Sequence, residues 1–152
     1  MPLTIPQNLL FRIQQHAEQE YPQECCGLGL ATNKNPDTLL EIIPCRNVQD
    51  ELHRKDPQTY PRTSRAAYLI DPRELLLVHQ RLRRDSLIIC LIYHSHIDAP
   101  AAFSEEDRRQ ALWEGNPVYP NAAYLIFSIQ AGKAFDSALF IWDSSRQDFI
   151  RG

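Results

Sequence analysis

The sequence predicts an α/β fold of the α+β type, in which helices flank a mixed, mostly antiparallel β-sheet. Apolar runs of strand length recur along the chain and are separated by turn residues, as in "NKNPD" at 33–37. Two of these runs, at 122–129 and 135–142, follow each other near the carboxyl end with only a short turn between them. A parallel sheet would instead require strands and helices to alternate strictly.

The chain is expected to open with a helix. Thr4 and Gln7 have the spacing of a capping box, and Pro6 suits a first helical turn. Pro22 cannot continue the helix and therefore ends it. Apolar residues recur on one face of this segment, at Ile5, Leu9, Ile13 and Ala17.

Strands are predicted next over 25–32 and 38–45. Segment 46–65 is polar, broken by prolines and without a period, so we expect a long connection without secondary structure. Long connections of this kind often border functional sites. A short strand is expected over 66–70.

A second helix is predicted to begin after Asp71, which is suited to the N-cap position. Pro72 then occupies the first helical position and Glu74 the third. The remaining elements are expected in this order: a strand over 86–96, a helix over 105–115 capped by Ser104, and closing strands over 122–129, 135–142 and 147–150.

Length and composition are typical of one soluble globular domain. The chain has 152 residues, of which 43% are hydrophobic and 23% charged, so it can bury a core without help from a structural metal. We therefore expect a single domain over residues 1–152. The net charge is −3, and the densest basic run, at 81–85, lies where a helix should end, so no nucleic-acid partner is expected.

The sequence also predicts a cytoplasmic location. No basic segment followed by an apolar run opens the chain, and the longest apolar stretch, 87–93, is too short to span a bilayer, so no membrane partner is expected. The cysteines form no CxxC pair, and we expect all four to be reduced, buried thiols. Their positions are Cys25, Cys26, Cys45 and Cys90.

His94 and His96 are candidate metal ligands at the end of the predicted central strand. Side chains alternate faces along a strand, so a spacing of two places both imidazoles on one face. Two neighbouring imidazoles are suitable ligands for zinc. The alternative is that one histidine packs in the core and the other faces solvent, and a bare HxH pattern more often has that structural meaning.

Ser104 and Asp107 follow in "SEED", which has the pattern of a helix start with Ser104 as the N-cap. Three residues are also almost one helical turn, so both side chains lie at the same helix end. If the loop at 97–103 returns this helix end to the strand end, Asp107 becomes a third ligand. Two histidines and one carboxylate with an open fourth position are typical of a catalytic zinc site.

Such a site also needs a general base. Glu24, in "YPQECCG", lies between a helix end and a strand, where it could reach a sheet edge. A solvent-facing acid in a turn is the alternative, and its position alone does not decide between the two.

Together these residues resemble the JAMM (MPN+) zinc metallopeptidases, in a small, stand-alone bacterial-type form. The resemblance rests on Glu24 in "PQECCGLGL", on the motif HSH-x7-S-x2-D over residues 94–107, on "YLIDPRELL" and on "AYLIFSI". The order of these features agrees over roughly residues 5 to 143. Ile97 and Leu91 depart from the family pattern, which usually has proline and often glycine there.

The resemblance implies a cytidine-deaminase-like MPN fold and a role for each matching residue. His94, His96 and Asp107 would bind one Zn²⁺ per chain. Glu24 would serve as general acid/base, and Ser104 would donate a hydrogen bond to the oxyanion, sharing its hydroxyl with the helix cap. The implied substrate is the C-terminal tail of a ubiquitin-like or sulfur-carrier protein, cleaved at a peptide or isopeptide bond.

Two other readings remain open. The chain could be a non-catalytic MPN scaffold that binds a protein partner, although the complete set of ligands speaks against this. It could also be an enzyme with Cys25 or Cys26 as nucleophile, which would leave the spacing of Ser104 and Asp107 without an explanation. The sequence leaves the oligomeric state open.

Overall fold

A six-stranded mixed sheet forms the centre of the computed structural model, which describes residues 2–152. Its strand order is β2-β1-β3-β6-β7-β8. Only β3 and β6 pair in parallel, and the other neighbours are antiparallel. The predicted α+β class is therefore confirmed. The strands are β1 (Cys26–Thr32), β2 (Glu41–Cys45), β3 (Leu87–Ile97), β6 (Ala123–Gln130), β7 (Lys133–Asp143) and β8 (Asp148–Arg151).

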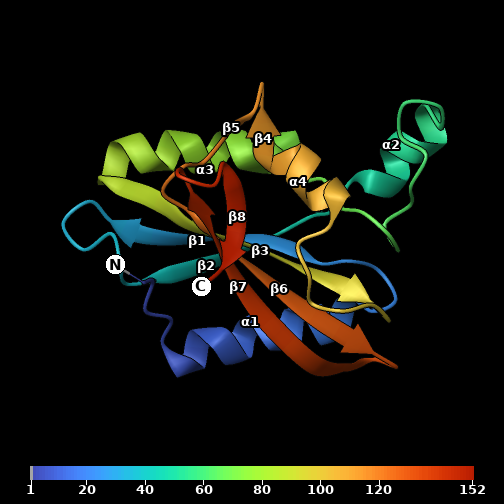
Figure 1. Cartoon of the computed structure of the whole chain (residues 1–152), viewed down its shortest axis with the longest axis horizontal. Coiled ribbons are helices and arrows are strands. Elements are labelled where there is room, and N and C mark those ends of the chain that lie inside the picture. Colours follow the sequence, from blue (N-terminus) through green and yellow to red (C-terminus); the bar gives the residue numbers. More distant parts are fainter. Residues whose placement is uncertain (1) are drawn as a thin grey trace.

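Helices cover both faces of this sheet (Figure 1). Helix α1 (Gln7–Glu20) packs on one face through Leu9, Ile13 and Ala17. Helix α3 (Pro72–Asp85) lies on the opposite face, on the same side as the short helix α4 (Glu105–Ala111). A two-stranded hairpin of β4 (Leu112–Trp113) and β5 (Asn116–Pro117) follows α4. In the described residues no helix is long and apolar enough to cross a membrane.

Strand β3 contributes to both hydrophobic cores because its side chains alternate between the two faces. Leu91 and Tyr93 pack in the core beneath α1. Ile92 packs in the opposite core, together with residues of α3 and of the segment before it. His94 and His96 continue the register of Ile92, and the same alternation therefore places them on the α3 side of the sheet.

The second predicted helix start is confirmed, but the first capping box is wrong. The Asp71 side chain accepts a hydrogen bond from the Arg73 backbone N–H at 2.9 Å, with Pro72 at the first helical position. Helix α1 instead begins after Pro6 and has no side-chain cap. Thr4 is held elsewhere, since its backbone pairs with the segment preceding β2.

Segment 46–70 also differs from expectation. The predicted irregular connection contains helix α2 (Gln49–Lys55), with acidic residues in its first turn and basic residues in its last. This charge order suits the helix dipole and was the available signal for the helix. The strand expected over 66–70 is absent from the described structure, where only Ile70 forms an isolated bridge, to Asn47.

The third predicted helix ends earlier than expected, at Ala111 rather than at 115. The chain turns back at Glu114 and Gly115, which both have positive φ, 51° and 81°. Two consecutive positive φ values are typical of the tight turns of hairpins. The short hairpin β4–β5 therefore replaces the last helical turn.

Candidate metal centre

His94 and His96 lie at the carboxyl end of an inner strand. Strand β3 is flanked by β1 and β6, and His94 is directly opposite Cys26 on one side and Ile126 on the other. His94 is 0% exposed and His96 is 8% exposed. The sheet thus holds both imidazoles at a fixed, nearly water-free position.

Asp107 reaches the histidines from the first turn of α4. The capping box predicted at this helix is present: the Asp107 N–H donates to Ser104 Oγ at 3.1 Å, and the Ser104 N–H donates to Asp107 Oδ2 at 3.0 Å. Asp107 Oδ1 lies 2.9 Å from His94 Nε2, and Oδ2 lies 3.0 Å from His96 Nε2. The two Nε2 atoms are 3.3 Å apart. The structure therefore brings these three predicted ligands together, as a buried group that can hold a metal ion.

The hydrogen bonds of His96 direct its Nε2 toward the other two candidate ligands. His96 Nδ1 lies 2.7 Å from the carbonyl oxygen of Pro100, which can only accept, so Nδ1 carries the hydrogen. In the neutral ring the lone pair is then on Nε2, and it faces Asp107 and His94. A proton or a metal ion between this nitrogen and the Asp107 carboxylate would satisfy both acceptors.

The same contacts shift the pKa values of the group. Burial alone would raise the pKa of Asp107, but His94 and His96 outweigh it and hold that pKa well below its ordinary range. Burial lowers the pKa of His94. For His96, burial opposes protonation, but the hydrogen bond and charge of Asp107 raise the pKa overall. Asp107 is therefore ionised at neutral pH, the form in which a carboxylate can bind a metal ion.

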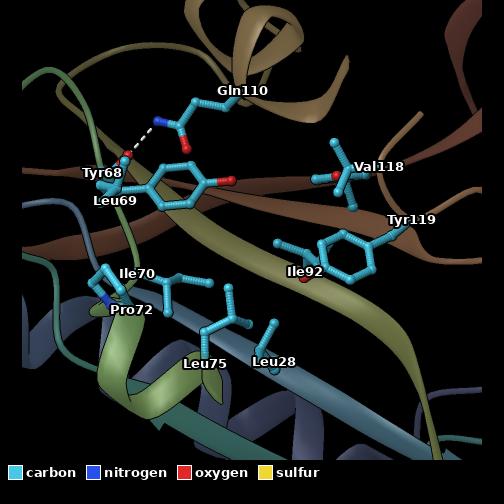
Figure 2. Close-up of a pocket in the computed structure, with 11 residues that line it drawn as sticks. Leu28, Tyr68, Leu69, Ile70, Pro72, Leu75, Ile92, Gln110, Val118 and Tyr119 are labelled. Carbon is cyan, nitrogen blue, oxygen red and sulfur yellow. Dashed lines mark hydrogen bonds between the residues drawn. The ribbon is translucent and has the colours of Figure 1, made fainter. Parts of the chain in front are cut away.

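Tyr68 lines an apolar cavity of about 280 Å³ on the same face of the sheet (Figure 2). Its ring stacks on His94 with centroids 4.4 Å apart. Its backbone carbonyl accepts a hydrogen bond from the Gln110 side chain on α4. Sequence analysis assigned Tyr68 to a strand and missed its contact with a candidate ligand, because nothing local indicates which ring will cover the site.

The backbone of Glu24, between α1 and β1, is held by two hydrogen bonds. Its backbone N–H donates to the Ser64 carbonyl at 2.7 Å, and its own carbonyl accepts from Asn47 Nδ2 at 2.9 Å. Glu24 is 5% exposed, and it lines a cavity of about 200 Å³ together with Ser104, His96 and Asp107. Four of the five predicted site residues thus line one cavity, and the fifth, His94, contacts Asp107.

Burial is the main cause that raises the pKa of Glu24, to about 8, and the charge of His96 opposes it. The folded protein without metal therefore favours the protonated carboxyl. In the unfolded chain the Glu24 carboxyl has its ordinary pKa, near 4.5, so it ionises there at a lower pH than in the folded protein. Stability is then lost as the pH rises from about 4.5 to about 8, and the full cost remains above that range.

We therefore expect Glu24→Gln to stabilise the metal-free protein at pH 8 by about 2–4 kcal/mol relative to wild type. The gain should vanish near pH 4, where both states carry the protonated carboxyl. Urea unfolding of the chelator-treated proteins at both pH values checks this. The exposed Glu114→Gln is the matched control, and an equal effect of the two changes at pH 8 would contradict the shifted Glu24 pKa.

The buried cysteines do not provide a reactive thiol here. Burial is the largest cause that raises the pKa of Cys25, to about 12, and burial likewise raises the pKa of Cys26 above its ordinary range. Both residues are free and at most 2% exposed. A thiol held in its protonated form is a poor nucleophile, so the cysteine-nucleophile reading loses its chemical basis.

Comparison with known proteins agrees with the geometry. Residues 6–141 match the family model that describes prokaryotic homologues of the JAB domain. The chain belongs to this JAB-domain family. A relative from Thermus thermophilus, described as a probable TtuB-protein conjugate cleaving protease, is 32% identical over 133 residues. The alignment covers 88% of this chain and 74% of the relative.

Solved structures also resemble this JAB-family chain. The solution structure of a protein from Desulfitobacterium hafniense has a TM-score of 0.70 and 24% identity, covering 99% of this chain and 89% of that one. The solution structure of a protein from Salinibacter ruber has a TM-score of 0.64 and 25% identity, covering 99% of this chain and 88% of that one. The JAMM resemblance seen in the sequence is thereby confirmed at the level of the family and the fold.

Proposed function

We propose that residues 1–152 act as a single zinc metallopeptidase domain. Its substrate would be a peptide or isopeptide bond at the C-terminal tail of a ubiquitin-like or sulfur-carrier protein. One observation carries the proposal: three ligand atoms converge beside a cavity that Glu24 and Ser104 also line. The family and the protease relative support the hydrolase class.

The donor set fits zinc. Zinc binds histidine nitrogen and carboxylate oxygen at roughly 2.0–2.2 Å, so two ligand atoms in a tetrahedron lie about 3.3 Å apart. The spacing of 3.3 Å between the two Nε2 atoms agrees with this value, and the Asp107 oxygens lie somewhat closer to them, at 2.9 and 3.0 Å. His94, His96 and Asp107 would hold the ion, and three protein ligands would leave it a further position for water or substrate, as in catalytic zinc sites.

Each side chain then has a chemical role. When bound, zinc supplies Lewis-acid polarisation of the substrate carbonyl and a hydroxide nucleophile at neutral pH. Glu24 accepts the proton of the attacking water and later delivers it to the leaving amine. The raised pKa of Glu24 belongs to the metal-free protein, and a bound Zn²⁺ would oppose it and favour the ionised form that accepts the first proton.

Ser104 can cap the helix and serve the oxyanion at the same time, because the two hydrogen bonds use different parts of its hydroxyl. The capping bond from Asp107 N–H uses a lone pair of Ser104 Oγ. The hydroxyl hydrogen remains free to donate to a second acceptor. Ser104 also lines the cavity, where a substrate carbonyl would lie.

We expect Ser104→Ala to lower kcat by about 10²–10³-fold and to reduce the free energy of unfolding by about 1 kcal/mol. The loss of the oxyanion donor causes the first effect, and the loss of the helix cap causes the second. Ser104→Thr keeps both functions of the hydroxyl and is the control. Steady-state kinetics and urea unfolding measure the two effects, and a Ser104→Ala kcat within threefold of wild type would contradict the oxyanion role.

The substrate class rests on the Thermus relative, whose name describes cleavage of a TtuB-protein conjugate. The direct test is to incubate this chain with a TtuB-protein conjugate and with an unconjugated control protein. Cleavage at the junction that stops with a zinc chelator and returns with added Zn²⁺ supports the proposal. A zinc-loaded chain that leaves the conjugate intact, and nevertheless binds it, would favour the non-catalytic scaffold.

The cytoplasmic location also stays a proposal. Four reduced, buried cysteines support it, because an oxidising compartment would favour disulfides.

A further inference from the structure

The two candidate histidine ligands differ in how their second ring nitrogens are held. His96 Nδ1 donates to the Pro100 carbonyl at 2.7 Å, whereas His94 Nδ1 is buried without a partner among the described residues. A histidine that binds a metal usually donates this N–H to a fixed acceptor, which orients the ring toward the ion. Of the two imidazoles, only that of His96 has such an orienting bond, so the position of Pro100 matters for the metal centre.

The start of the loop that carries Pro100 has little apolar packing of its own. Asp98 and Pro100 are exposed, and Ala99 is half-buried. Short and exposed side chains bury little apolar area, so the hydrophobic effect holds this part of the loop weakly. Polar contacts from other elements therefore fix its backbone.

Ser128 makes the first of these contacts. It lies on β6, directly opposite His96 in the parallel register, and is 0% exposed. Its hydroxyl donates to the Ala99 carbonyl at 2.6 Å and accepts from Gln130 Nε2 at 3.3 Å. The Ala99 carbonyl belongs to the peptide unit that joins Ala99 to Pro100, so Ser128 holds the backbone immediately before the acceptor of His96.

Asp98 makes the other contacts, at the first residue after β3. Its φ is 51°, a left-handed conformation that aspartate tolerates better than most residues, and its N–H donates to the Ile129 carbonyl at 2.8 Å. Its carboxylate accepts from Ala131 N–H at 3.0 Å, from the Tyr21 hydroxyl at 2.9 Å and from Arg65 at 3.2 Å. The start of the loop is thus tied to the β6–β7 turn, to the end of α1 and to the segment between α2 and α3.

We propose that Ser128 and Asp98 are positioning residues of the metal centre, which hold the loop so that the Pro100 carbonyl orients His96 toward the ion. This inference rests on the proposed function. Neither residue lines the cavity or belongs to the three candidate ligands, so both act through His96. Losing a group that orients a ligand typically lowers metal affinity by about 10–100-fold.

Zinc affinity, measured by competition with a chelator, tests the proposal without turnover. We expect Ser128→Ala to weaken zinc binding by about 10–100-fold, and the half-buried Ser137→Ala on β7 to leave it unchanged. Asp98→Gly keeps the left-handed backbone without the carboxylate and should weaken binding by about tenfold. Asp98→Asn keeps an oxygen that can accept from Ala131 N–H, so it should restore the affinity to within about threefold of wild type.

The cobalt-loaded proteins provide a readout that a loss of stability alone would not change. At saturating Co²⁺, visible absorption reports the geometry of the ligands, and proton NMR reports how fast the His96 ring N–H exchanges with water. We expect an altered spectrum and faster exchange in Ser128→Ala and in Asp98→Gly at full loading. Ser137→Ala should match wild type in both measurements.

Zinc affinity equal to wild type in both Ser128→Ala and Asp98→Gly would overturn the proposal. Weaker binding with unchanged cobalt spectra and exchange at full loading would also overturn it, because a purely structural role gives that result. If Ser128→Ala does not fold, Asp98→Gly and its rescue by Asp98→Asn decide the question. A folded wild-type chain that takes up no zinc is the separate signature of a failed proposed function, and it would overturn this inference as well.

Discussion

Replacing Glu24 by glutamine is expected to lower kcat by about 10²–10⁴-fold while the zinc content stays unchanged. Glutamine keeps the size of the side chain but cannot carry a proton between water and the leaving amine. Glu24 is not among the three residues whose ligand atoms converge, so the metal should remain. Cleavage kinetics and metal analysis of the same preparation measure both quantities.

The exposed Glu114→Gln serves as the control, with kcat expected to equal that of wild type. A Glu24→Gln protein that retains zinc and turns over within tenfold of wild type would remove Glu24 from the mechanism. Loss of zinc in the same variant would instead make Glu24 part of the metal site. Glu24→Gln is expected to stabilise the metal-free protein, so general unfolding would not explain a loss of activity.

The second large effect is expected at Gly27, where β1 lies against the ring of Tyr93. A Cβ added at Gly27 would meet ring atoms of Tyr93 at 2.2–2.3 Å, far below a normal contact. Tyr93 is 0% exposed, and its hydroxyl is hydrogen-bonded to His16 Nδ1 at 2.9 Å, so the ring has no free space to enter. We expect Gly27→Ala to reduce the free energy of unfolding by about 1–3 kcal/mol.

A double-mutant cycle isolates this contact. In a Tyr93→Leu background the ring is absent, so Gly27→Ala should cost much less than in the wild-type background. Urea unfolding of the four proteins gives the coupling free energy. Strictly additive effects would mean that Gly27 is required for a reason other than the approach of Tyr93.

Local sequence signals predicted how several of the candidate side chains are placed. The capping box of Ser104 and Asp107 depends on residues three apart, and the shared face of His94 and His96 depends only on strand alternation. These patterns are strong because short-range geometry fixes them. From the sequence, Asp107 could join the histidines only if a bend returned α4 to the end of β3. The structure contains this bend.

The missed features depend on long-range contacts. Helix α2 buries only Gln49, so it lacks the apolar stripe that predicts a helix from sequence. Residues 66–70 are apolar enough for a strand. The Tyr68 ring packs on His94, however, and the segment does not join the sheet. The course of segment 62–64 depends on hydrogen bonds to α2 and to Glu24, and no local pattern contains that information.

The sheet buries polar side chains near the end of β3. Ser95 Oγ keeps a partner there, since it accepts from Cys25 N–H at 2.8 Å. His94 Nδ1 is the exception, because it is the one buried side-chain nitrogen or oxygen among the described residues without a partner. Strand pairing fixes the backbone at His94 but leaves this nitrogen unsatisfied.

The most direct test of the account is to measure bound zinc per chain in wild type, His96→Ala and Asp107→Ala, with His53→Ala as a matched histidine control. Circular dichroism of the same samples verifies that each protein is folded. The account predicts about one zinc ion per chain in wild type and in His53→Ala, and almost none in the other two. Folded wild-type protein that takes up no zinc when it is supplied at neutral pH, or zinc retained by both ligand variants, would contradict it.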